Sequence, residues 1–170
     1  MLKRRSHQLV RSLAGLAILM PLAPLVLADD QDDREALSAQ IEYLSEARAL
    51  SDMDVPIAAG SLIAEFYANR NFAPAWTDQD QVAGLIEVIE GTRAEGLDPV
   101  DYYADAVAGI FAQMRSGSAD PGEKAAADIL LTESLIRVVY HQLFGKVDPT
   151  TLNPNWNFGR DRRGLHPAAL

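Results

Sequence analysis

One stretch of the sequence, residues 121–144, constrains the fold more than any other. Asp120 can cap a helix, Pro121 suits the first helical position, and Glu123 stands where a capping box needs an acid. Gly145 follows the stretch and can close the helix. The second half of the stretch has few polar residues, and a helix that is apolar nearly all round usually lies at the centre of its domain. We therefore predict a long central helix here.

Helical spacing of apolar residues recurs along the chain, whereas no segment shows a convincing two-residue alternation typical of a strand. Further helices are expected near residues 33–49, 62–70, 78–95 and 107–114, with a short helical turn after Asp98-Pro99. The predicted fold class is therefore all-α: an irregular helical domain of about five to six helices with a long central helix.

The N-terminal 28 residues differ in kind from the rest. They begin with basic residues, continue with an apolar run over 13–27 that Pro21 and Pro24 interrupt, and end at Ala28 before two aspartates. This pattern predicts a secretory signal peptide, residues 1–28, cleaved after Ala28. A retained membrane anchor is the alternative, although the run is short for a span. The localisation predicted from this segment is periplasmic, with no stable membrane span after cleavage.

Removing this segment makes the chain strongly acidic. The remainder has 11 basic and 24 acidic residues, a net charge of −13, and such a surface repels phosphate backbones. Nucleic acid is therefore not an expected partner. The chain also lacks cysteine, which excludes a disulfide, a thiolate metal site and a cysteine nucleophile from it.

Candidate catalytic residues are sparse. His141 and His166 have no second ligand at a metal-like helical spacing, so we expect no metal and no cofactor, and we assign no catalytic residue. Glu133 followed by Ser134 resembles the catalytic pair of helical lytic transglycosylases, but the later Gly-Leu-Met-Gln motif of those enzymes is missing. Glu133 also stands four residues before Arg137, a spacing that favours an ion pair on one helix face.

The segment "EFYANRNFAPAW", residues 65–76, gathers a third of the chain's twelve aromatic residues. One interpretation is a buried corner, with Phe66 and Tyr67 on a helix face and Phe72 and Trp76 folded back over it. The other is a binding surface on which Tyr67 and Trp76 contact a glycan or a partner.

Three phrases in this order resemble one family: "FYANRNFAPAW", "AEGLDPVDYY" and "LLTESLIRVVYHQLFGKVDPTTLNPNW". Together they are similar to the N-terminal scaffold domain of large periplasmic murein L,D-transpeptidases, over roughly residues 57–158. In that family a separate domain carries a Ser/Thr-His-Gly-Cys motif, whose cysteine attacks a peptidoglycan stem. That motif is absent here, so no catalytic residue of the family can be assigned to this chain.

The resemblance implies a non-catalytic scaffold that supports peptidoglycan crosslinking, with peptidoglycan or a catalytic L,D-transpeptidase domain as its partner. The predicted organisation is a signal peptide (1–28), an acidic N-terminal helix and connection (29–56), a scaffold-like helical domain (57–158) and a polar tail (159–170). Whether the chain is a fragment or a standalone scaffold stays open at this stage. An autonomous module that recruits a cell-wall enzyme and a lytic enzyme using Glu133 are the alternative functions.

Overall fold

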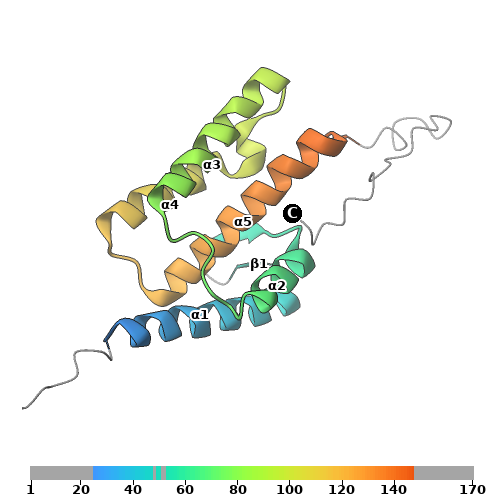
Figure 1. Cartoon of the computed structure of the whole chain (residues 1–170). Helices are drawn as coiled ribbons and strands as arrows, with labels where there is room; N and C mark the ends of the chain where they lie inside the picture. The colour runs from blue at the N-terminus through green and yellow to red at the C-terminus, as the bar shows by residue number, and fades with distance from the viewer. Residues whose placement is uncertain (1–24, 48, 51–52, 148–170) are drawn as a thin grey trace, which may run out of the picture.

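The computed structural model describes residues 25–47, 49–50 and 53–147, and these residues form a helical domain (Figure 1). The α-helices are α1 (Leu25–Ala47), α2 (Gly60–Asn69), α3 (Gln79–Gly91), α4 (Ala104–Ser116) and α5 (Pro121–Phe144). Two short 3-10 helices, η1 (Thr92–Glu95) and η2 (Pro99–Tyr102), connect α3 to α4. The all-α prediction and the predicted number of helices are confirmed for this part of the chain.

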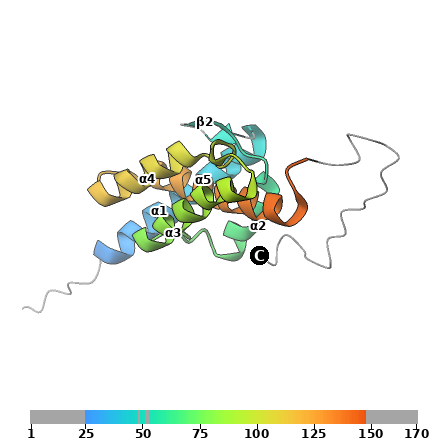
Figure 2. The ribbon, with the colours of Figure 1, turned by 90° about the horizontal axis from the view of Figure 1, so that it is seen from above.

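Helix α5 is the centre of the domain. It lies between α1 on one side and α3 with α4 on the other (Figure 1), and the view from above shows α3 and α4 covering the side of α5 that faces away from α1 (Figure 2). Its N-terminal half is buried continuously from Ala125 to Ser134. The prediction of a long central helix is confirmed, and so are its two ends: Asp120 and Glu123 form the capping box, and Gly145 follows the last turn with a φ of 76°.

Helix α1 and the connection after it belong to the same packed unit. Leu37, Ile41 and Leu44 of α1 are buried in one cluster with residues of α5, because their spacing places them on one helix face. The helix begins at Leu25, earlier than the predicted start near Asp33, since no proline or glycine interrupts residues 25–47. No helix among the described residues is long and apolar enough to span a membrane.

A short hairpin, which the sequence did not indicate, joins α1 to α2. Strands β1 (Ala49–Leu50) and β2 (Met53–Pro56) pair antiparallel. Two and four residues are too few to show a two-residue alternation, so the expected end of the first helix near Ala49 falls on β1 instead. After the hairpin the chain contacts α5 just before α2 begins.

Candidate functional site

The aromatic segment turns sharply after α2 and folds back over α5. Asn71 and Phe72 both adopt left-handed backbone conformations, with φ of 52° and 55°, and the Phe72 amide donates to the Tyr67 carbonyl at 2.8 Å. Asparagine tolerates this region, whereas phenylalanine adopts it at a cost. The Phe72 side chain packs against the core, and this packing offsets the cost of its backbone conformation.

Two arginines hold the turn by its carbonyl groups. Arg70 donates to the carbonyl oxygens of Ala73 at 3.4 Å and Pro74 at 3.2 Å, and Arg34 of α1 donates to that of Asn71 at 2.8 Å. The Arg70 guanidinium also lies 5.3 Å from the centre of the Phe66 ring, within range of a cation–π contact. The turn is therefore fixed to both α1 and α2.

A buried carboxylate on α5 receives the end of this turn. The backbone amides of Ala75 and Trp76 each donate to Asp128 at 2.9 Å, one to each carboxylate oxygen, and the Tyr67 hydroxyl donates to it as well. Thr132, one helical turn further on, accepts from the Trp76 indole nitrogen at 2.9 Å. Both ends of the aromatic segment are thus bound to the same face of α5.

Burial dominates the electrostatics of this network. It raises the pKa of the Asp128 carboxyl above its usual range, although the hydrogen bonds from Tyr67, Ala75 and Trp76 act in the opposite direction. Burial also raises the pKa of Tyr67, and the negative charge of Asp128 raises it further. The phenol therefore stays protonated and serves as a fixed donor.

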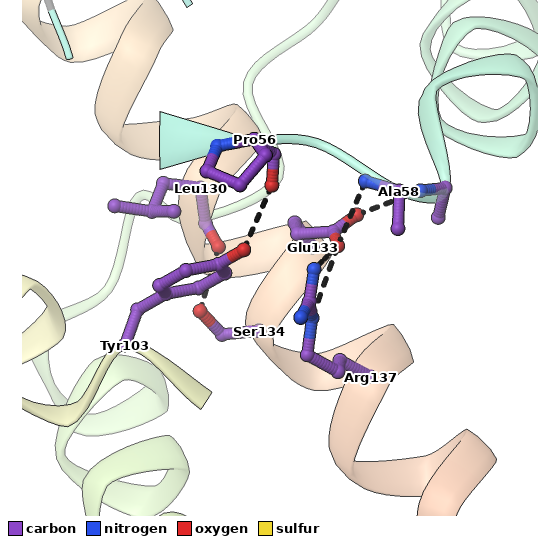
Figure 3. A network of polar contacts seen from close by, with 8 residues as sticks. Pro56, Ala58, Tyr103, Leu130, Glu133, Ser134 and Arg137 are labelled. Atoms are coloured by element: carbon purple, nitrogen blue, oxygen red, sulfur yellow. Dashed lines mark hydrogen bonds and ion pairs between the residues drawn. The ribbon is translucent and has the colours of Figure 1, made fainter. Parts of the chain in front are cut away.

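A second buried carboxylate on α5 holds the start of α2 (Figure 3). Glu133 accepts from the backbone amides of Ala58 at 3.1 Å and Ala59 at 3.0 Å, and Ala59 is the N-cap of α2. Arg137 donates to the same carboxylate at 2.8 Å, so the predicted ion pair is confirmed. A negative charge at a helix N-terminus is favourable because the first amides have no partner within the helix.

The neighbourhood of Glu133 is completed by Tyr103. Its hydroxyl donates to the Pro56 carbonyl at 2.7 Å, and the Arg137 guanidinium lies 4.9 Å from the centre of its ring. Figure 3 shows the Tyr103 ring reaching toward Pro56 while Glu133 and Arg137 face each other beside Ala58. The hairpin, α2, α4 and α5 therefore meet at one polar cluster.

A pocket of about 340 Å³ lies beside the Asp128 network. It is bounded by α1, by the segment from Pro74 to the first residue of α3, Gln79, by the C-terminal end of α4 and by the first turns of α5. Its lining is mixed: Leu37, Ile110, Met114 and Leu131 are apolar, and Asp33, Gln79, Gln113, Glu123 and Lys124 are polar. Trp76 and Asp128 belong to the lining, and an ion pair between Lys124 and Asp33 at 3.2 Å joins α5 to α1 beside it.

The two residues predicted to contact a glycan or a partner occupy different positions. Tyr67 is 0% exposed, and its ring cannot stack on a sugar in this arrangement. Trp76 is half-buried and lines the pocket. The structure links the two residues through Asp128 and Thr132, whose role the sequence did not predict. The signal in the sequence was the position of Asp128, an acid among the apolar residues of the first half of α5.

The candidate catalytic residues form hydrogen bonds and packing contacts within the fold. Glu133 is 1% exposed and is surrounded by the donors that hold α2. His141 lies against Tyr102, with its Nδ1 atom 3.2 Å from the Tyr102 hydroxyl. His166 lies outside the described residues. Within the described ranges, no three His, Asp or Glu side chains are grouped so as to hold a metal ion.

Comparison with known proteins gives one match. The family model described as Scaffold domain matches residues 61–170. No curated protein and no solved structure matches the chain. The matched range includes the aromatic turn, Asp128 that holds it, Glu133, and the whole of α2 apart from its first residue. Because the match covers more than half of the sequence, the chain belongs to the scaffold-domain family.

Proposed function

We propose that this chain is the non-catalytic scaffold portion of a periplasmic peptidoglycan L,D-transpeptidase, where it supports cell-wall crosslinking or remodelling. Its membership of the scaffold-domain family supports the scaffold role. The resemblance of its three ordered phrases to the scaffold domains of murein L,D-transpeptidases supports the link to peptidoglycan.

The observation that carries the proposal is that side chains of the resembling segments hydrogen-bond to other segments of the same chain. Tyr67 and Trp76 of the aromatic phrase bind Asp128 and Thr132 of α5, and Glu133 of the third phrase holds the first residues before α2. These side chains form contacts that join one segment of the fold to another. Such an arrangement builds a rigid support, because every hydrogen-bonding group that it uses is satisfied internally.

A lytic activity based on Glu133 is poorly supported. A general acid in glycoside cleavage must reach the glycosidic oxygen of its substrate. The Glu133 carboxylate is instead enclosed by the backbone of Ala58 and Ala59 and by Arg137. It is also absent from the lining of the 340 Å³ pocket.

A second candidate function is an autonomous binding module that recruits a cell-wall enzyme. The pocket beside Trp76 favours it, because an aromatic wall with amide and carboxylate groups at the edge suits a sugar ring with hydroxyl or acetamido groups. In this version Trp76 contacts the glycan, and Gln79 and Gln113 offer hydrogen bonds to it.

We further propose that the chain is exported and that the signal peptide is removed after Ala28. The motive is the basic start, the apolar run and the small residue at the cleavage position. In the structure this position lies in the first turns of α1, upstream of Ala36 and Leu37, which pack against the core.

Two binding measurements on the mature chain test the proposal and separate its two versions. An affinity-tagged chain is mixed with an L,D-transpeptidase catalytic domain, and separately with purified sacculi. Retention of the catalytic domain supports the scaffold role. Retention of sacculi supports the binding module if Trp76→Phe and Gln113→Ala abolish it. The control, Glu87→Ala on the exposed face of α3, should leave this retention unchanged. A chain that retains neither overturns both versions.

A further inference from the structure

The second half of α5 carries an exposed apolar stripe. Leu135, Val139 and Leu143 follow one another every four residues and therefore lie on one helix face. Leu135 is 38% and Leu143 is 51% exposed, with Val139 between them half-buried, although the first half of the same helix is buried from Ala125 to Ser134. Val147, just beyond the helix, is also exposed. We call Leu135, Val139, Leu143 and Val147 the α5 stripe.

The α5 stripe contains no charge of its own. Between Leu135 and Phe144 the only permanently charged residue is Arg137, and its side chain turns toward Glu133 (Figure 3). Contiguous exposed apolar surface on a soluble domain usually marks a site that something else covers. The α5 stripe is therefore a candidate contact surface on the central helix.

We propose that the occupant is the chain's own segment 149–158, which folds back along the α5 stripe and places Trp156 and Phe158 on it. The family match supports this assignment, because it continues to residue 170 and so includes 23 residues after Val147, the last one described. The segment follows directly from the end of the stripe. The segment contains three large apolar side chains that would cover the stripe: Leu152, Trp156 and Phe158.

The lengths are compatible with this arrangement. From Leu135 to Leu143 the helical part of the stripe extends about 12 Å, at 1.5 Å per helical residue. The nine residues from Val147 to Trp156 can reach about 30 Å when extended. Helix α5 has already ended at Phe144 before Gly145, and Pro149 could not continue it, because proline cannot donate a backbone hydrogen bond.

Charge complements the apolar contact. Residues 159–163 contain Arg160, Arg162 and Arg163 with one aspartate, whereas the rest of the mature chain is strongly acidic. Glu95 lies beside the outer half of α5, where Gln142 donates to it at 3.4 Å, and Asp98 is exposed on the adjoining turn. An arginine-rich stretch after Phe158 would be attracted to these acids when the preceding residues lie on the stripe.

Tryptophan fluorescence tests the contact directly, because the chain has only two tryptophans. In the mature chain with Trp76→Phe, the emission reports Trp156 alone. We expect a blue-shifted emission that is protected from quenchers. Leu143→Asp should shift it toward that of an indole in water. Val88→Asp is the matched control, since Val88 is 43% exposed on α3, and it should leave the emission unchanged.

A cysteine pair provides a second measurement that keeps Trp76 intact. Because the chain has no cysteine, a disulfide can form only between the two introduced residues. Under mild oxidation, Leu143→Cys with Phe158→Cys should crosslink much faster than Val88→Cys with Phe158→Cys, because residues 156 and 158 face the stripe in an extended segment. Equal rates for the two pairs, or an emission of Trp156 that Leu143→Asp does not alter, would overturn the proposal. A dimer of the wild-type chain that Leu143→Asp dissociates would show that a second copy is the occupant instead.

Discussion

The Glu133 carboxylate accepts a hydrogen bond from the backbone amide of Ala59 at 3.0 Å, and these two residues are 74 positions apart in the chain. Ala59 has no side chain that could cap α2, and Glu133 of α5 instead binds the two amides that directly precede this helix. The central helix therefore determines where α2 begins. Asp128, on the same helix, determines where the turn after α2 ends.

Removing Glu133 should destabilise the fold. Glu133→Ala leaves two amides without an acceptor and leaves Arg137 without its carboxylate, so we expect a loss of about 3–5 kcal/mol in the free energy of unfolding. Chemical denaturation measures this loss. Glu87→Ala, on the exposed face of α3, is the control and should change the free energy by less than about 0.5 kcal/mol. Equal midpoints for the two variants would show that Glu133 does not hold α2.

The aromatic turn should depend on the Trp76 ring. Trp76→Ala removes a half-buried indole and its hydrogen bond to Thr132, and we expect a loss of about 3 kcal/mol, toward the lower end of the range for large aromatic residues. Thermal melts in parallel with sacculi pull-downs distinguish the two interpretations of this residue. A variant with an unchanged melt and no retention on sacculi would show that Trp76 serves binding rather than packing.

Asp128 should make stability depend on pH. Burial raises its pKa, so the folded chain binds this proton more tightly than the unfolded chain, whose ordinary value is about 3.9. The stabilisation that the proton gives is fully present below that unfolded value, and it is lost as the pH rises through the raised folded value. The stability of the wild type relative to Asp128→Asn should therefore fall as the pH increases from about 4.

Denaturation of both chains across this pH range measures the difference. Asp105→Asn, at an exposed position of α4, is the control and should run parallel to the wild type. A wild type that gains stability over Asp128→Asn with rising pH would mean that the three hydrogen bonds to the carboxylate outweigh its burial.

Export should leave the fold intact. Cleavage after Ala28 removes part of the first turns of α1 and leaves Ala36, Leu37, Ile41 and Leu44, which pack in the core, in place. Mass spectrometry of the periplasmic protein should find Asp29 at the N-terminus, and the mature chain should melt like the full-length one. A periplasmic chain that still begins at Met1 would contradict the predicted cleavage.

The parts of the fold that sequence predicts well are those with local signals. Asp120, Glu123 and Gly145 define both ends of α5 through contacts within a few residues, and the Glu133–Arg137 pair follows from helical spacing alone. Asp128 escaped prediction because its partners, Tyr67, Ala75 and Trp76, lie more than fifty positions away.

Some features have no local signal at all. The left-handed conformation of Phe72 is one, because the residue adopts it only while its ring packs against the core. The short strands β1 and β2 are another, since two and four residues are too few to show a two-residue alternation. Burial of Tyr67 could be expected from its helix face, but the role of its hydroxyl could not.

The most direct test of the central claim, that this chain is a scaffold without chemistry of its own, is a product analysis. The purified mature chain is incubated with peptidoglycan and with tetrapeptide stems, alone and together with a cysteine-containing L,D-transpeptidase catalytic chain, and the products are separated by chromatography. We expect no change with the chain alone, and more crosslinked product when it accompanies the catalytic chain than when the catalytic chain acts by itself. New crosslinks or anhydro-sugar ends from the chain alone that disappear in Glu133→Gln would contradict the scaffold role.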